Sequence, residues 1–199
     1  MAKYSDLDLG TIEAVVNKLG GMDGVKRFLS GELAIKAAEH IFALWKTIKL
    51  GTGLVTADDF RRALKAGNFR IGDWGNDILG RRGFTAADEE TEMDLVVLSV
   101  AELGFKDGAY RKDIYKRALK LGLELCPAEV GPQLRLQYKD QPMDEWLRIA
   151  MEPIITGSGG DLGVFIVGRG GGDLWLRGGG GHDRFWIVSN RWVFVRPRK

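Results

Sequence analysis

The sequence predicts an α+β protein, in which a helical bundle region, residues 1–88, precedes a mixed α/β domain with antiparallel strands, residues 89–199. Up to about residue 88, apolar residues recur at helical spacing and the runs end at glycine. Further along the chain, β-branched runs and alternating stretches dominate. With 199 residues, 45% of them hydrophobic and 28% charged, the chain has the composition of a globular protein and room for two small folded regions.

The first region contains several helix patterns separated by glycine. Helices are expected over residues 11–19, 22–29, 32–50, 56–67 and 73–79. Thr56 is the expected N-cap of the fourth helix, because Asp58 and Asp59 follow it in the first turn, where acidic side chains are favourable. We expect these helices to form a small bundle used for packing or for assembly.

The second region changes to strands after a polar stretch, residues 81–92, which is expected to be a linker or a helix start. Strands are expected over 95–100, 134–138, 146–151, 164–167, 174–176 and 192–195, and one amphipathic helix over 110–123. The sequence from Gly170 to Asp173 predicts a tight hairpin between two of the strands. Pro197 ends the last strand.

Charge and hydropathy restrict the partners and the location. The net charge of +2 provides no field for general binding to nucleic acid or to an anionic membrane. No apolar leader follows the polar N-terminus, and the longest apolar runs are too short for a membrane span. A soluble, cytoplasmic protein is therefore expected, and display at a surface stays open as an alternative.

The residues that usually perform catalysis are scarce. His40 and His182 are the two histidines, and they form no metal-binding spacing and no recognisable triad with a serine or cysteine. Cys126 is the single cysteine, which excludes an internal disulfide and is typical of a buried structural thiol. The glycine-rich stretch 157–163 is followed by a strand and not by a helix, so it predicts a hairpin loop and not a phosphate site. We expect no catalytic residues, no metal and no cofactor, and the protein is not expected to be an enzyme.

Two other functions stay open as alternatives. The first is a DNA-binding regulator that uses the N-terminal helices, although Lys26 and Arg27 are the main polar residues there that could contact bases. The second is a hydrolase that uses carboxylates near Tyr138, and these are Asp140, Asp144 and Glu145. A solvated charge cluster between strands is the favoured interpretation of these carboxylates.

The segment from Gly178 to Arg191 is the exception to the regular patterns. It mixes aromatic, aliphatic, charged and amide residues with no period of two or 3.6. Loops with such composition commonly carry recognition, because a rigid scaffold holds varied side chains outward. The alternative is that Phe185, Trp186 and Ile187 fill a core beneath a long loop. We therefore expect the binding surface to lie between Gly168 and Trp192.

Trp186 and the residues 190–199, which follow the expected strand 174–176, carry a family resemblance. They resemble the variable proteins of diversity-generating retroelements, whose C-terminal domain has a C-type lectin fold. The strand–helix–strands order from Leu95 to Val195 also suits that fold. In such proteins, error-prone reverse transcription substitutes template adenines, so that asparagine codons become many residue types. Lys, Glu, Gln, Met and Trp are not readily reached in this way, and between residues 178 and 191 only Trp186 belongs to that set.

The resemblance implies that residues 89–199 form a C-type-lectin-like ligand-binding domain. The diversified, ligand-binding positions that it implies are Arg177, Gly178, His182, Asp183, Arg184, Phe185, Ile187, Val188, Ser189 and Asn190. Trp175, Trp186 and Trp192 are the implied scaffold around this hypervariable loop. The implied partner is an unidentified ligand, expected to be a protein, and nucleic acid is not expected. Oligomerisation through the N-terminal helices is a further expectation, while calcium-dependent sugar binding is not implied.

Overall fold

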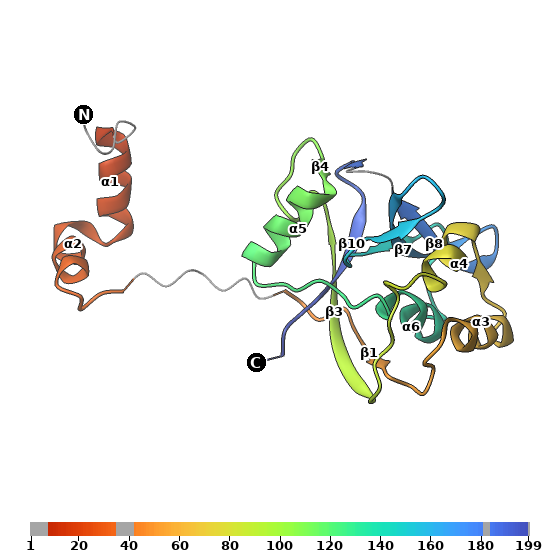
Figure 1. The fold of residues 1–199 in the computed structure, drawn as a ribbon. Coiled ribbons are helices and arrows are strands. Elements are labelled where there is room, and N and C mark those ends of the chain that lie inside the picture. Colours follow the sequence, from red (N-terminus) through yellow and green to blue (C-terminus); the bar gives the residue numbers. More distant parts are fainter. Residues whose placement is uncertain (1–7, 35–41, 181–183, 199) are drawn as a thin grey trace. The chain divides into compact units, whose positions relative to one another are not determined.

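The computed structural model describes residues 8–34, 42–180 and 184–198 (Figure 1). The chain divides into two compact units, residues 1–39 and 40–199. The predicted boundary near residue 88 is therefore wrong, because residues 46–79 supply strands and helices to the second unit. The N-terminal helical part is correspondingly shorter than the expected 88 residues. Each unit is described by itself.

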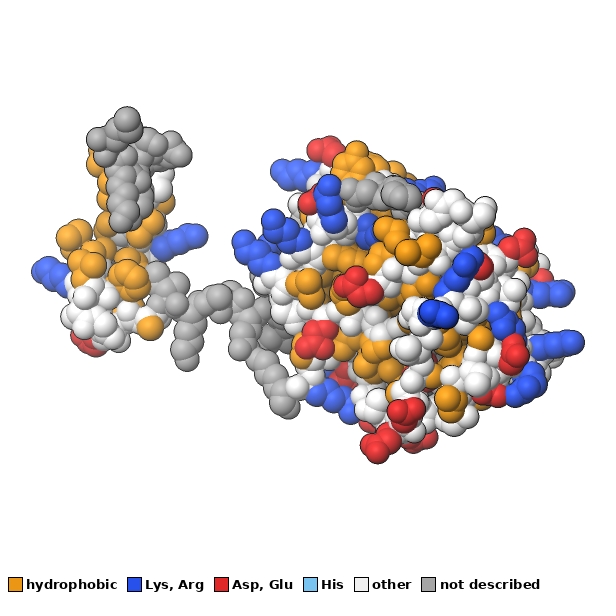
Figure 2. All heavy atoms as spheres, in the orientation of Figure 1, with side chains coloured by type: hydrophobic (Ala, Val, Ile, Leu, Met, Phe, Trp, Pro, Cys, Tyr) orange, Lys and Arg blue, Asp and Glu red, His pale blue; other side chains and the backbone are white. Residues whose placement is uncertain are grey.

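The first unit is a pair of helices, α1 (Leu9–Lys18) and α2 (Gly21–Leu29), close to the predicted ranges. The Asp8 carboxylate caps α1 by accepting a hydrogen bond of 2.6 Å from the backbone N–H of Thr11. Hydrophobic side chains lie on the surface of both helices (Figure 2). Gly24 is the one buried residue of the two helices, so they enclose no apolar core of their own.

The second unit is built on an eight-stranded sheet, counted over the described residues, with the order β1-β3-β10-β5-β7-β8-β2 and with β6 paired to β7. The strands are β1 (Lys46–Leu50), β2 (Arg70–Ile71), β3 (Thr91–Ser99), β5 (Trp146–Ile149), β6 (Ile154–Thr156), β7 (Asp161–Gly170), β8 (Asp173–Gly180) and β10 (Arg191–Val195). Every pair is antiparallel except β10–β5 and β2–β8. Two short strands, β4 (Ala109–Tyr110) and β9 (Phe185–Trp186), form a separate antiparallel pair. The fold is mixed α/β with a mostly antiparallel sheet, as the sequence predicted at that level.

Four helices accompany the sheet, namely α3 (Ala57–Ala66), α4 (Asp73–Leu79), α5 (Arg111–Lys120) and α6 (Val130–Gln137). The predicted cap of α3 is confirmed: the Thr56 hydroxyl accepts from the Asp59 N–H at 3.2 Å, and the Asp59 carboxylate accepts from the Thr56 N–H at 2.8 Å. The predicted hairpin is also confirmed, since Gly171 and Gly172 take positive φ values of 62° and 86° between β7 and β8.

The two faces of the sheet are covered by different helices. Helix α6 packs on the face that carries Phe165, where Gly131 allows close approach, because a Cβ there would lie 2.5 Å from the Phe165 ring. On the opposite face, Tyr115 of α5 packs edge-on against Trp192, with ring centroids 5.7 Å apart. The Tyr115 hydroxyl donates to the Met151 carbonyl oxygen at 2.9 Å, which fixes α5 beside β10.

Two secondary-structure predictions are wrong, and in both cases tertiary contacts are the cause. In the predicted helix 32–50, the described residues 32–34 and 42–45 are not helical, and residues 35–41 lie outside the described part. Residues 46–50 form β1, because Ile48 and Leu50 alternate with exposed residues and pair with β3. Residues 134–138 lie in α6 and at its end, not in a strand. Their alternation of apolar and polar residues suggested a strand with Arg135 on its polar face. Arg135 is instead fully buried in the helix, and its guanidinium donates to Gln141 Oε1 at 2.5 Å and to the Tyr138 carbonyl oxygen.

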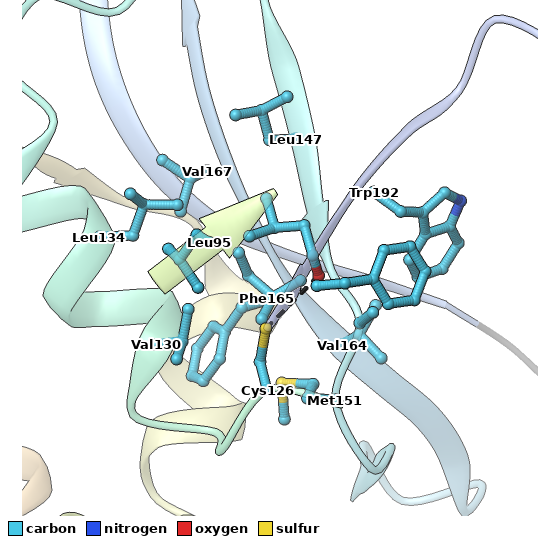
Figure 3. Close-up of a cluster of buried hydrophobic side chains, with 14 of the residues drawn as sticks. Leu95, Cys126, Val130, Leu134, Leu147, Met151, Val164, Phe165, Val167 and Trp192 are labelled. Carbon is cyan, nitrogen blue, oxygen red and sulfur yellow. Dashed lines mark hydrogen bonds between the residues drawn. The ribbon is translucent and has the colours of Figure 1, made fainter. Parts of the chain in front are cut away.

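The single cysteine is buried, as predicted, in the centre of the core (Figure 3). Its Sγ donates to the Val193 carbonyl oxygen at 3.4 Å, and burial raises the pKa of the thiol far above its usual value. The surrounding side chains come from several strands and from α6, and they include Leu95, Val130, Leu134, Leu147, Val164, Phe165 and Val167. Cys126 is therefore a packing residue.

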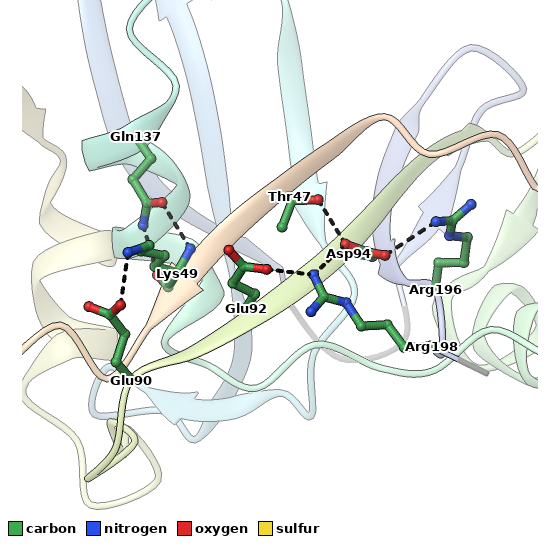
Figure 4. Close-up of polar contacts among 8 residues, drawn as sticks. All are labelled: Thr47, Lys49, Glu90, Glu92, Asp94, Gln137, Arg196 and Arg198. Atoms are coloured by element: carbon green, nitrogen blue, oxygen red, sulfur yellow. Dashed lines mark hydrogen bonds and ion pairs between the residues drawn. The ribbon is translucent and has the colours of Figure 1, made fainter.

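The end of the chain is held to the sheet by a polar network (Figure 4). The Asp94 carboxylate accepts from Thr47 Oγ1 at 2.7 Å, from Arg198 at 2.9 Å and from Arg196 at 3.2 Å. These hydrogen bonds, first that of Arg198 and then that of Thr47, hold the pKa of Asp94 well below its usual value. Residues 196–198 are thus fixed to β3 and β1.

None of the helices in the described ranges is both long enough and apolar enough to cross a bilayer.

Candidate binding surface

Eight of the ten predicted binding positions lie in the described part of the chain, and five of these eight are exposed. Arg177, Arg184, Phe185, Ile187 and Ser189 have exposed side chains, with 47% of Phe185 and 58% of Ile187 accessible to solvent. Gly178, Val188 and Asn190 are half-buried. His182 and Asp183 lie outside the described residues, as does His40.

The expected scaffold tryptophans differ in depth. Trp186 is 4% exposed and Trp192 is fully buried, and their rings pack edge to face with centroids 5.1 Å apart. Trp175 is half-buried on β8. Phe185 and Ile187 point outward on either side of Trp186, so that of these three residues only Trp186 fills the core. The alternative that all three fill a core beneath a long loop is therefore wrong.

The backbone of this segment is held by main-chain hydrogen bonds. Trp186 pairs with Ala109 in the short β4–β9 ladder. After β9, the Val188 carbonyl accepts from the Ala101 N–H and the Asn190 carbonyl from the Val100 N–H, both at 3.0 Å. The conformation of residues 185–190 therefore depends on backbone groups and on Trp186, and the exposed side chains contribute little to it.

The register of the sheet brings tryptophan and arginine together on the face that also carries Trp192. Arg148 of β5 lies between Trp192 of β10 and Ile166 of β7, and Arg177 of β8 follows Ile166 in the same row. Opposed residues in a sheet share a face, so these side chains project from one side. The neighbouring row contains Trp146, Gly168 and Trp175.

Two glycines of β7 leave the space that the Trp146 indole occupies. A Cβ at Gly168 would lie 2.1 Å from the Trp146 ring, and one at Gly170 would lie 2.9 Å from it. The ring therefore covers the bare backbone of β7. Trp175 is fixed by its own hydrogen bond, in which its Nε1 donates to the Gly170 carbonyl oxygen at 3.1 Å.

Three arginines stack on these rings. The Arg177 guanidinium carbon lies 4.7 Å from the ring centroid of Trp146 and 4.3 Å from that of Trp175. The guanidinium carbons of Arg148 and Arg184 lie 5.0 and 5.3 Å from the centroid of Trp186. These are cation–π distances. We call the six residues Trp146, Arg148, Trp175, Arg177, Arg184 and Trp186 the Trp–Arg platform.

Arg148 is the most constrained cation of the platform. Burial, and then the charge of Arg184, lowers the pKa of Arg148 to about 10. Its Nη1 donates to the Trp146 carbonyl oxygen at 3.2 Å, whereas its buried Nε has no hydrogen-bond partner in the part of the chain that the structure describes. Arg191, nearby on β10, is by contrast paired with the Glu145 carboxylate at 2.6 Å.

Two hollows adjoin the platform. A cavity of about 460 Å³ is lined by residues 142–146, Arg148 and residues 189–191. A second cavity, of about 340 Å³, is lined by residues 71–74, Trp175, Arg177 and Gly178. Trp146 and Arg148 border the first cavity, and Trp175 and Arg177 the second. The platform thus lies between two concave regions and could contact a ligand over both.

Sequence reasoning missed Trp146 and Arg148, which it placed on a strand but not at the site. Gly168 and Gly170 could have indicated them. Glycines two residues apart in a strand leave a bare stripe on one face, and a large ring from a neighbouring strand can cover such a stripe.

The carboxylates of the alternative hydrolase hypothesis have structural partners or are exposed. Glu145 accepts from the Tyr138 hydroxyl at 2.9 Å as well as from Arg191. Burial and this hydrogen bond raise the pKa of Tyr138 above its usual value. Asp140 and Asp144 are exposed, and of these two only Asp144 lines the larger of the two hollows. In the ranges that the structure describes, no group of three or more His, Cys, Asp or Glu residues is arranged to hold a metal ion.

Comparison with family models, curated proteins and solved structures found no match. The retroelement resemblance therefore stays a proposal that depends on the residues of this chain.

Proposed function

We propose that this protein binds a ligand through a diversified surface near its C-terminus, as the variable proteins of diversity-generating retroelements do. The observation that carries the proposal is that exposed and buried residues have different roles in the segment 184–190. Arg184, Phe185, Ile187 and Ser189 are exposed, while Trp186 and backbone hydrogen bonds hold the segment in place. Side chains on such a segment can change without loss of the fold.

The topology of the second unit supports a C-type-lectin-like domain. From β3 onward the elements are close to the strand–helix–strands order that the resemblance leads us to expect, with β4 and helix α6 in addition. The last strand, β10, inserts between β3 and β5 and so joins the two ends of this region in one sheet. A rigid sheet immediately beside the variable segment is what a tolerant recognition surface needs.

The helical unit suits a role in assembly. Its side chains Leu9, Met22 and Leu29 are 73%, 61% and 78% exposed, which is unusual for large apolar residues unless another surface covers them. We propose that α1 and α2 mediate association, so that several binding surfaces are presented together.

A library at four positions tests the binding proposal. Arg184, Phe185, Ile187 and Ser189 are randomised together in the full chain, and individual members are examined by thermal unfolding. Most members are expected to melt within a few degrees of the parent, because exposed substitutions change stability by about 0.5 kcal/mol or less. Selection against an unrelated protein is expected to yield binders. General loss of folding, or a well-folded library without binders, contradicts the proposal.

The matched control lies inside the same segment. Trp186→Ala removes the one buried side chain of β9 and is expected to cost about 3–5 kcal/mol in the free energy of unfolding. A library position that behaved like Trp186 would belong to the core.

The flanking DNA gives an independent test of the retroelement origin. A near-copy of the 3′ coding end that differs mainly at adenines is the expected finding. A flanking region without such a copy contradicts this part of the proposal and leaves the binding test untouched.

A further inference from the structure

The arginines of the platform have no carboxylate partner among the described residues, in contrast to several other arginines of the chain. Elsewhere the structure pairs Arg61 with Asp58, Arg81 with Asp77 and Arg70 with Asp173. Arg148, Arg177 and Arg184 have no ion pair with any residue that the structure describes. Three cations thus lie on one face of the sheet with no ion pair to a described residue.

Stacking orients these guanidinium groups but leaves their hydrogen-bond donors free. A guanidinium presents five N–H donors around its edge, whereas a cation–π contact uses its face. Neither Arg177 nor Arg184 donates a hydrogen bond to a described residue, and Arg148 makes a single one, to the Trp146 carbonyl. The tryptophans therefore hold the arginines in fixed positions with their edges available.

The repulsion between two of these arginines favours an anion. Arg148 and Arg184 approach the same Trp186 ring, and each like charge disfavours the other. A bound carboxylate would accept hydrogen bonds from both and offset this repulsion. The Nε of Arg148 is enclosed, so such a carboxylate would bind at the outer nitrogens of the guanidinium group.

The neighbouring surface has the composition that is typical of protein interfaces. Phe185 and Tyr110 pack edge to face with centroids 5.3 Å apart, and 47% and 45% of these residues are exposed. Ile187 and Met143 are also exposed, at 58% and 51%. Aromatic, methionine and arginine side chains are enriched in protein–protein interfaces. Single-stranded nucleic acid would need open ring faces for its bases, but arginines cover the platform's rings.

We infer that the Trp–Arg platform binds the carboxylates of an acidic, partly apolar segment of a partner protein. Arg148, Arg177 and Arg184 donate to the carboxylates, while Phe185, Ile187 and their neighbours contact apolar side chains. The inference rests on the proposed function and names the partner class of the same surface. Arg177 and Arg184 belong to the predicted variable positions, whereas Arg148 and Trp146 do not. A preference for acidic partners therefore has a component that diversification leaves in place.

Titration of the ¹⁵N-labelled full chain with two peptides tests the inference. The first is an acetylated, amidated pentapeptide of alternating glutamate and phenylalanine, and the second has glutamine in place of glutamate. The acidic peptide is expected to shift the Arg148 Nε–H and Trp186 indole signals saturably, with an affinity at least about tenfold above that of the glutamine peptide. Equal affinity for the two peptides overturns the inference.

Three arginine variants locate the site. Arg184→Gln, whose parent side chain is exposed, is expected to weaken the acidic peptide about tenfold, and Arg148→Gln at least as much. Arg148→Lys keeps the charge but loses the planar fork and is expected to fall between the wild type and Arg148→Gln. Thermal unfolding checks that each variant is folded. Because Arg184→Gln changes only a surface residue, unchanged affinity in that variant overturns the assignment even if the Arg148 variants do not fold.

Arg82→Gln is the matched control. Arg82 is an exposed arginine that lines a separate cavity of about 670 Å³. The substitution removes the same charge away from the platform, so the affinity for the acidic peptide is expected to stay within twofold. A loss as large as that of Arg184→Gln would show a general charge effect and overturn the inference.

Two further arms exclude other ligands. Oligothymidine is expected to bind more weakly than the acidic peptide, and tighter binding would overturn the choice of a protein partner. Asp183 is the nearest carboxylate in sequence to Arg184. Asp183→Asn is expected to leave the peptide affinity unchanged within about threefold, and a tenfold gain would show that the chain itself supplies the carboxylate.

Failure here and failure of the proposed function give different results. If the acidic peptide does not bind while the library still yields binders, only the preference for acidic partners is lost. If the library does not fold, the proposed function fails whatever the peptide does.

Discussion

Two groups of arginines in the second unit use the same side chain in opposite ways. Arg196 and Arg198 are paired with the Asp94 carboxylate at 3.2 and 2.9 Å, and they fasten the end of the chain to the sheet. The arginines of the Trp–Arg platform instead lie against indole rings. A carboxylate partner consumes the N–H donors of a guanidinium, whereas an aromatic partner leaves them available. The first group therefore stabilises the fold, and the second keeps N–H donors available, as the proposed ligand site requires.

The largest loss of stability is expected when Trp192, which packs against Trp186 of the platform, is replaced. Trp192→Ala removes a fully buried ring that contacts both Tyr115 and Trp186. A loss of about 3–5 kcal/mol in the free energy of unfolding is expected, measured by urea denaturation. Phe185→Ala, which truncates an exposed ring, is the control and should cost about 0.5 kcal/mol. Similar losses in the two variants would remove the distinction between scaffold and surface.

A methyl group at Gly168 should disturb the platform without touching the arginines. The new Cβ would lie 2.1 Å from the Trp146 ring, so Gly168→Ala is expected to displace that ring and to cost about 1–3 kcal/mol. Binding of the acidic peptide should weaken with it. Gly159→Ala has nothing within 4 Å of its added Cβ and should change neither stability nor binding. An unchanged Trp146 indole signal in Gly168→Ala would contradict the proposed packing.

The carboxylate-paired group should respond to acid. The ionised Asp94 is stabilised in the folded state, so its contribution is fully present above its unfolded pKa of about 4. It is lost as the pH falls from there towards the lowered pKa. The difference in unfolding free energy between wild type and Asp94→Asn should thus be constant near pH 7 and shrink below about pH 4. Asp88→Asn, at an exposed site, should show no such change, and a constant difference for Asp94→Asn would contradict the network.

The smallest change in stability is expected when an arginine of the platform is replaced. Arg177→Gln removes an exposed cation that has no ion pair with a described residue, and its stacking on Trp146 and Trp175 is lost. Thermal unfolding should show a change of about 0.5–1 kcal/mol. A loss comparable to that of Trp192→Ala would mean that Arg177 is a structural residue like Arg135.

Local patterns predicted those elements that depend on neighbours in sequence. Helix α4, the Thr56 N-cap of α3 and the β7–β8 turn follow from short-range chemistry, and each was predicted. Strand β1 was missed because its polar alternation is short and its stabilisation comes from β3, more than 40 residues away. Helix α6 was missed because Arg135 is buried among partners that lie outside the helix.

The candidate site divides in the same way. The composition of residues 178–191 predicted a surface segment, and the family resemblance implied that Trp186 is part of its scaffold. Trp146 and Arg148 could not be assigned to it, because they join it only through the parallel pairing of β5 with β10 and the antiparallel pairing of β5 with β7. A single chain position carries no information about the strand that will lie beside it.

The sequence by itself determined where several helices end, where the β7–β8 hairpin turns and which segment near the C-terminus has an unusual composition. All of these features depend on residues a few positions apart. The tertiary structure decided which arginines meet carboxylates and which meet tryptophans. The reason is the register of the sheet. It brings residues from β5, β7 and β8 into one row, while Arg196 and Arg198, which follow β10, reach Asp94 of β3 on the other side of that strand.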